Sequence, residues 1–64
     1  MYVRYKIDYS NLTSSECDKL FSRIDMVAYD SAYNPNEKVC VFSLRREEDY
    51  QLLNVPDKCK VQRL

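Results

Sequence analysis

Hydrophobic and polar residues alternate strictly at the start of the chain, over residues 2 to 9. The odd-numbered positions carry apolar and aromatic side chains: Val3, Tyr5, Ile7 and Tyr9. The even-numbered positions carry polar or amphipathic ones: Tyr2, Arg4, Lys6 and Asp8. Because successive side chains of a strand point to opposite faces, this alternation predicts a half-buried β-strand.

A helix start follows at Thr13. The Thr13 hydroxyl can accept a hydrogen bond from the first helical turn, and Glu16 can reach back to the Thr13 backbone, which is the capping-box pattern. Leu12 can also pack against Cys17 across this start. The apolar residues that follow recur at helical spacing: Cys17, Leu20, Phe21 and Ile24. We therefore expect an amphipathic helix that ends near Asp25.

The second half of the chain predicts four more elements. Period-two alternation over residues 26 to 33 indicates a strand. A turn follows at residues 34 to 37, where proline and asparagine supply turn geometry, and the apolar run in residues 38 to 44 indicates a central strand. We expect a short charged helix over residues 45 to 53 and a last strand over residues 58 to 64.

This element order predicts one α+β domain over residues 1 to 64, a length that allows a single core. Strand, helix, strand, strand, helix, strand is the split βαβ order of the ferredoxin-like βαββαβ fold. Both helices would cover one face of a four-stranded sheet, with the first and third strands in its middle. The alternative is a βαβββ meander with one main helix, in which residues 46 to 53 form an irregular loop.

Charge and composition narrow the possible functions and locations. Ten basic and ten acidic residues cancel, so no overall field directs the chain to nucleic acid or to an anionic membrane. No apolar run approaches the ~20 residues of a membrane span, and the first residues alternate instead of forming a signal peptide. We therefore expect a cytoplasmic protein. Three cysteines, an odd number, fit a reducing compartment.

The chain contains neither glycine nor histidine. Phosphate-binding loops need glycine, and histidine is the usual general base and the commonest metal ligand. Cys17, Cys40 and Cys59 are far apart in the sequence, so they lack the close pairs typical of zinc sites. We interpret Cys17 and Cys40 as core residues, and we leave a thiol switch or small enzyme centred on Cys59 as a minor alternative. The prediction is a protein without catalytic activity, cofactor or metal.

Six tyrosines suggest how the chain acts. Tyr5 and Tyr9 lie on the buried side of the first predicted strand, whereas the others are harder to bury. Tyrosine and arginine are enriched where proteins bind each other. The predicted partner-binding residues are Tyr2, Tyr29, Tyr33, Tyr50, Arg45 and Arg46. We expect a small binding module that inhibits or modulates a larger protein, as phage or mobile-element accessory proteins do to host defence enzymes.

Nucleic-acid binding is the alternative function. If the first and last strands are neighbours, one basic patch forms on the face away from the helices: Arg4, Lys6, Lys58 and Lys60. RNA-binding domains of ferredoxin-like fold use that face, but with stacking aromatic residues that this sequence lacks there. A solvated sheet face explains the same residues. The second and last strands would be sheet edges, which leaves room for a homodimer through an edge strand.

Overall fold

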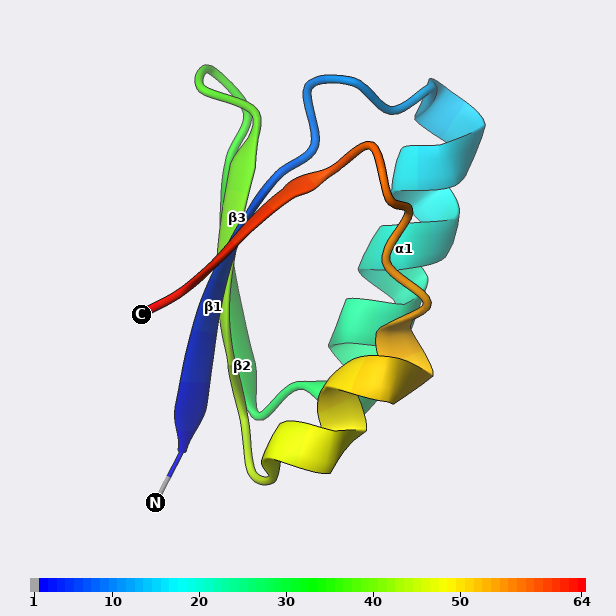
Figure 1. Cartoon of the computed structure of the whole chain (residues 1–64). Helices are drawn as coiled ribbons and strands as arrows, with labels where there is room; N and C mark the ends of the chain where they lie inside the picture. Colours follow the sequence, from blue (N-terminus) through cyan, green and yellow to red (C-terminus); the bar gives the residue numbers. More distant parts are fainter. Residues whose placement is uncertain (1) are drawn as a thin grey trace.

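One sheet and one helical layer make up the structure, a computed structural model that describes residues 2–64. The elements are β1 (Val3–Asp8), the α-helix α1 (Ser14–Val27), β2 (Asp30–Asn34), β3 (Val39–Leu44), the 3₁₀-helix η1 (Glu47–Leu53) and β4 (Lys60–Arg63). Figure 1 shows α1 and η1 on the same side of the sheet, which leaves the other sheet face open. Within residues 2–64, no helix has both the length and the apolar character needed to cross a bilayer.

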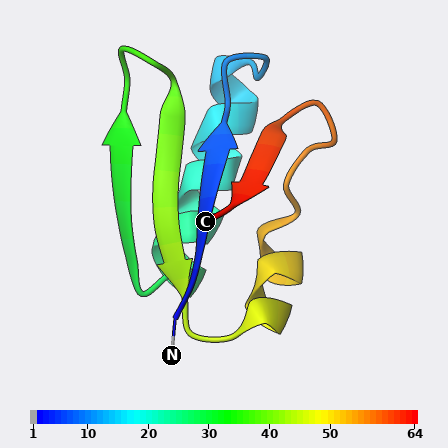
Figure 2. The ribbon, with the colours of Figure 1, turned by 60° about the vertical axis from the view of Figure 1, so that its left-hand side comes forward.

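The sheet is antiparallel throughout, with the strand order β2-β3-β1-β4. β1 and β3 lie in the middle, as predicted, and β2 and β4 form the two edges (Figure 2). The alternative meander is right about a single α-helix, but its connectivity is wrong because β4 pairs with β1 and not with β3. The fold is thus an α+β domain with one α-helix packed on four antiparallel strands.

The core lies between the sheet and the helical layer. β1 and β3 contribute alternate residues to it, in the register that pairs Tyr5 with Phe42 and Ile7 with Cys40. The buried apolar residues are Tyr5, Ile7, Tyr9, Leu20, Ile24, Cys40, Phe42, Leu44 and Leu53. The alternation predicted for β1 is therefore confirmed.

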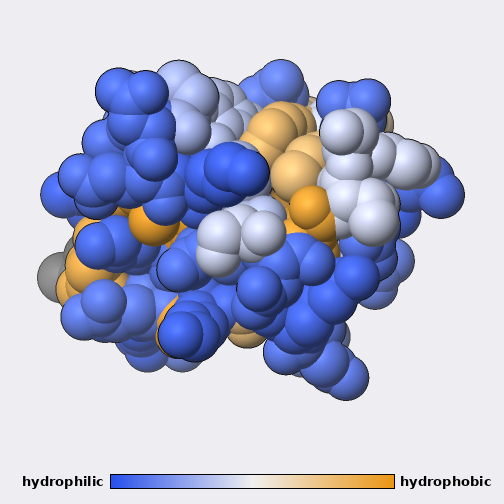
Figure 3. Space-filling model, turned by 90° about the horizontal axis from the view of Figure 1, so that it is seen from above, coloured by the Kyte–Doolittle hydropathy of each residue, from blue (hydrophilic) through white to orange (hydrophobic). Residues whose placement is uncertain are grey.

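The start of α1 has the predicted capping box. The Thr13 N–H donates to Glu16 Oε1 at 2.9 Å, and the Glu16 N–H donates to Thr13 Oγ1 at 3.3 Å. Figure 3 looks down on this end of the molecule and shows a mainly hydrophilic surface with small hydrophobic areas. The capping box thus gives the backbone N–H groups of Thr13 and Glu16 hydrogen-bond partners at the start of α1.

The end of α1 differs from the prediction. The helix continues to Val27, so residues 26 and 27 are helical and the strand predicted to start there begins at Asp30. Val27 lies three residues after the buried Ile24 and continues the apolar stripe, which explains the extension. The Ala28 N–H then donates to the Ile24 carbonyl at 2.8 Å and closes the last turn.

The predicted turn between β2 and β3 is confirmed. Asn34 Oδ1 accepts from the N–H groups of Asn36 and Glu37, at 3.1 and 3.2 Å. Lys38 then takes a left-handed φ of 57° before β3, in a chain that has no glycine for this position. Two hydrogen bonds to the Asn34 side chain and one residue with a left-handed φ therefore form a turn in which glycine is usually found.

The segment predicted as a second short helix is a 3₁₀-helix, Glu47–Leu53. Tyr50 and Leu53 are three residues apart, which is one turn of a 3₁₀-helix, so both face the core. Asn54 ends the segment with a left-handed φ of 49°. β4 begins at Lys60, later than the predicted residue 58.

Candidate interaction surface

Three predicted partner-binding residues from separate parts of the sequence meet at one end of the sheet. In Figure 1 this is the lower end, where β1 and β2 begin and where α1 and β3 end. Val3 pairs with Leu44, which brings the neighbouring residues Tyr2 and Arg45 to the same end of the sheet. We refer to Tyr2, Tyr29 and Arg45 as the tyrosine–arginine cluster.

The cluster is held together by aromatic and cation–π contacts. The rings of Tyr2 and Tyr29 stack with their centroids 4.4 Å apart and their planes 24° from parallel. The Arg45 guanidinium carbon lies 5.4 Å from the centroid of the Tyr29 ring. These geometries are attractive for both kinds of pair. A hydrogen bond with Tyr29 is the main cause that raises the pKa of the Tyr2 phenol, and Arg45 opposes this shift.

The cluster is nevertheless exposed. Tyr2 is 49% and Tyr29 is 52% exposed, so the contacts do not bury the rings in the core. Pre-ordered aromatic side chains lose little conformational entropy when a partner covers them. This end of the molecule therefore presents an ordered surface that combines large apolar area with a cation.

A hollow of about 500 Å³ lies beside the cluster. Its lining residues are Met26, Val27, Ala28, Tyr29, Arg45, Arg46 and Asp49. Arg46 forms ion pairs with Asp49 at 3.3 Å and with Glu48 at 3.7 Å. Among residues 2–64, no ion pair involves Arg45. Arg45 therefore offers the hollow an uncompensated positive charge.

Met26 belongs to this surface, although the sequence interpretation placed it in a strand. It lies on the last turn of α1 and is 85% exposed. Ile24 and Val27 face the core from the same turn, and Met26 therefore points away from it. Extending the helical stripe beyond Ile24 to Val27 is the signal that identifies Met26 as an exposed apolar residue.

Tyr33 and Tyr50 lie elsewhere and pack against the helical layer. The Tyr33 ring meets Phe21 edge-on at 4.7 Å, and the Tyr33 hydroxyl donates to Asp25 Oδ1 at 3.2 Å. Burial is the main cause that raises the pKa of Tyr33 to about 12. The Tyr50 ring lies 4.8 Å from that of Tyr5 and is half-buried. The structure thus brings together Tyr2, Tyr29, Arg45 and Arg46 and separates the other two predicted residues.

Three of the four predicted basic residues share the open face of the sheet. Arg4 and Lys6 alternate with the core residues of β1, and Lys60 follows on β4. Asp8 lies directly across from Lys60, so a negative charge interrupts the patch. Hydrogen bonds from Ser10 are the main cause that lowers the pKa of Asp8, and Lys60 and Lys6 add to it. The open face is mixed in charge.

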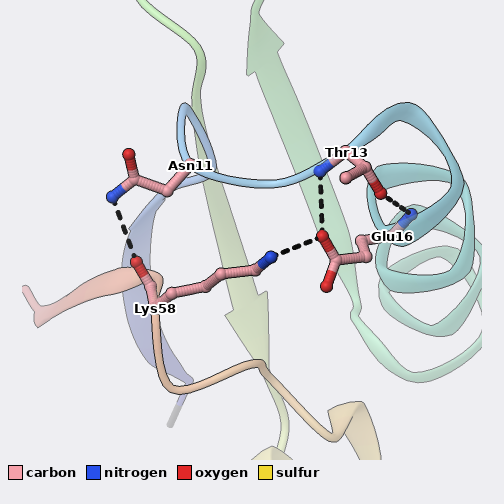
Figure 4. Close-up of polar contacts among 4 residues, drawn as sticks. All are labelled: Asn11, Thr13, Glu16 and Lys58. Carbon is pink, nitrogen blue, oxygen red and sulfur yellow. Dashed lines mark hydrogen bonds and ion pairs between the residues drawn. The ribbon is translucent and has the colours of Figure 1, made fainter.

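Lys58 is not on that face, contrary to the prediction. It precedes β4, and its ammonium group binds Glu16 Oε1 at 2.7 Å at the start of α1 (Figure 4). Asn11 Nδ2 donates to the Lys58 carbonyl at 3.3 Å. The hydrogen bond from Lys58, followed by that from the Thr13 backbone, lowers the pKa of Glu16 to about 2. Lys58 therefore joins the segment before β4 to the first turn of α1.

The cysteines are free thiols. Cys40 is in the core, as predicted, and burial raises its pKa to about 11. Cys17 is half-buried against the core. Burial also raises the pKa of Cys59, which is the opposite of the shift that activates a thiol. Within the described residues 2–64, no group of three His, Cys, Asp or Glu side chains is placed to hold a metal ion.

Comparisons with known proteins find no matching family model, no matching curated protein and no matching solved structure. Fold class alone does not determine function. A function for this chain must therefore be argued from its own surface chemistry.

Proposed function

We propose that this chain is a protein-binding domain whose contact surface is the tyrosine–arginine cluster together with Met26 and Arg46. The stacking of two half-exposed tyrosines under an arginine that forms no ion pair within residues 2–64 carries this proposal. Tyrosine and arginine are enriched among the few residues that contribute most of the binding energy in protein interfaces. Core packing explains Tyr33 and Tyr50, but it does not explain the ordered rings of Tyr2 and Tyr29.

The surface favours a partner with complementary chemistry. A carboxylate of the partner would pair with Arg45, and an apolar side chain would cover Met26 in the adjoining hollow. The chain would act by covering a surface of a larger protein and so modulate or inhibit it. The cluster itself holds no thiol, imidazole or carboxylate, which supports binding without catalysis.

We also propose that the domain is a reduced ferredoxin-like fold. The strand order β2-β3-β1-β4 and the position of α1 between β1 and β2 support this assignment. In that scheme, η1 occupies the place of the second helix.

Nucleic-acid binding through the open face is the second candidate, because Arg4, Lys6 and Lys60 do share that face. The opposing charge of Asp8 and the engagement of Lys58 by Glu16 make it the weaker one. Binding of this kind would fall steeply with salt.

Two double variants distinguish the candidates. The tagged chain, Tyr29→Ala/Arg45→Ala and Arg4→Ala/Lys60→Ala would each be used to capture partners from lysate of the source cell, with and without nuclease treatment, after circular dichroism shows that all three are folded. We expect Tyr29→Ala/Arg45→Ala to capture at least about tenfold less of the partner protein than the wild type. Arg4→Ala/Lys60→Ala should capture as much as the wild type. The reverse result, with nucleic acid bound by the wild type, would favour the open face. Equal capture by all three would exclude both surfaces.

A further inference from the structure

The free edge of β2 is the second surface of the molecule that is arranged for a partner. All five residues of this strand are exposed. Figure 2 shows β2 as the outermost strand, with β3 on one side and, among residues 2–64, no segment along the other. A free strand edge presents backbone N–H and C=O groups to any chain that can pair with them.

The hydrogen-bond register shows which backbone groups of β3 point to which neighbour. The Tyr9 N–H donates to the Lys38 carbonyl at 2.9 Å, and this pair lies two residues along each strand from the pair Ile7–Cys40. Every second residue of β3 from Cys40 therefore bonds to β1. The residues between them, such as Val41, bond to β2.

The same alternation then fixes the outer edge. Asp30, Ala32 and Asn34 are the partners of Ser43, Val41 and Val39, respectively, so their backbone groups bond inward to β3. The backbone groups of Ser31 and Tyr33 must point outward. This edge therefore offers two N–H groups and two carbonyls at an even spacing.

We propose that a second copy of this chain pairs along β2, antiparallel, with Ser31 of each copy opposite Tyr33 of the other. This register uses both outward N–H groups and both outward carbonyls of each copy. Ala32 then lies on the two-fold axis. A shift in one direction would need Tyr29, whose N–H already donates to Ser43 at 2.8 Å, and a shift in the other would need Pro35, which has no N–H.

Side chains support the same register. Asp30 faces Asn34 of the other copy and not a second Asp30, so no like charges meet. Asn34 Oδ1 already accepts from Asn36 and Glu37, which leaves its side-chain NH₂ group to donate to the other copy. A carboxylate is the natural acceptor for that group. The strand is thus complementary to itself in charge and in hydrogen bonding.

The other edge of the sheet differs. β4 contains Lys60 and Arg63, and charged side chains on an edge oppose pairing with another chain. Arg63 also forms an ion pair with Glu47 of η1 at 2.6 Å. Between Asp30 and Asn34, β2 has no lysine, arginine or proline. Self-pairing is therefore assigned to β2.

The five-residue strand gives a contact smaller than a standard interface of about 800 Å² per partner. The dimer should therefore dissociate on dilution. It is independent of the tyrosine–arginine cluster, and either proposal can fail without the other.

A charge introduced at Ala32 tests the pairing, because the proposed register places this residue opposite its own copy. We expect Ala32→Lys and Ala32→Glu each to weaken the dimer about tenfold or more, and their equimolar mixture to restore it. Ala32→Ser is the uncharged control and should dimerise like the wild type. Sedimentation equilibrium over a range of concentrations measures the wild type, the three variants and the mixture.

Amide hydrogen exchange tests the edge residue by residue. At high protein concentration, the amides of Ser31 and Tyr33 should become protected, whereas those of Val61 and Arg63 on β4 should not. A wild-type chain that stays monomeric at every concentration would overturn the proposal, and so would a dimer that tolerates either charge at Ala32.

Discussion

The two ends of α1 differ in what the contacts between their exposed side chains do. At its start, Glu16 accepts hydrogen bonds from Thr13 and Lys58, so that polar groups from two distant segments satisfy one another. Near its end, Tyr29 contacts both Tyr2 and Arg45, yet Tyr2 and Tyr29 each stay about half exposed. The first arrangement fastens the fold, whereas the second leaves contact area for a partner. The comparison predicts that substitutions at the start of α1 change stability and that those in the tyrosine–arginine cluster change binding.

The largest stability effect should come from the helix cap. Thr13→Ala removes the acceptor of the Glu16 N–H and should lower the free energy of unfolding by about 1 kcal/mol. In a domain of this size, that corresponds to a fall in melting temperature of roughly 4–8 °C. Thermal denaturation followed by circular dichroism measures it. Ser15→Ala is the control in the same turn and should change the unfolding free energy by less than about 0.5 kcal/mol.

Acid should weaken the same end of the helix. Folding lowers the pKa of Glu16 from 4.5 to about 2, so its carboxylate contributes stability above pH 4.5 that is lost as pH falls toward 2. The pKa of Asp8 is also lowered and acts in the same direction. Glu16→Gln isolates the contribution of Glu16. We expect the wild type to be more stable than this variant at neutral pH and the difference to shrink across that window in denaturant titrations; a constant difference would contradict the pairing with Lys58.

The tyrosine–arginine cluster should matter less for stability. Tyr29→Ala removes an exposed stack and a cation–π contact, and we expect it to lower the free energy of unfolding by about 0.5 kcal/mol. Urea denaturation compares it with Thr13→Ala. A loss larger than that caused by Thr13→Ala would mean that the cluster supports the fold and would weaken its assignment as a binding surface.

Local rules account for what the sequence could predict. The alternation of β1, the capping box at Thr13 and Glu16, and the turn after Asn34 each depend on residues close in the chain. The prediction that a strand starts at Met26 was wrong, because a short apolar segment fits a helix end and a strand start equally well. Local sequence patterns are least informative about the residues at which helices and strands begin and end.

The arrangement of the site could not be predicted from local patterns, because it depends on contacts between segments that are distant in the sequence. Sequence composition pointed to Tyr2, Tyr29 and Arg45, but their meeting follows from the register of β1 on β3, which a one-residue shift would destroy. Lys58 illustrates the reverse case. Its alternation suggested the open sheet face, and only the tertiary contact with Glu16 shows where its charge lies.

The smallest predicted effect tests whether the cluster is assembled in solution. Tyr29 raises the pKa of the Tyr2 phenol, chiefly through a hydrogen bond, and Arg45 lowers it. Tyr29→Phe keeps an aromatic ring for stacking but removes the hydroxyl, so the pKa of Tyr2 should fall toward its ordinary value of 10.0. Arg45→Gln should instead raise that pKa further. A pH titration of the assigned Tyr2 ring signal by NMR measures both variants, with Tyr50→Phe, on the core side of the sheet, as the control that leaves it unchanged. If neither variant moved the pKa of Tyr2, the two rings and the guanidinium would not be in contact in solution, and the lower end of the sheet would lose the order that distinguishes it from an ordinary exposed surface.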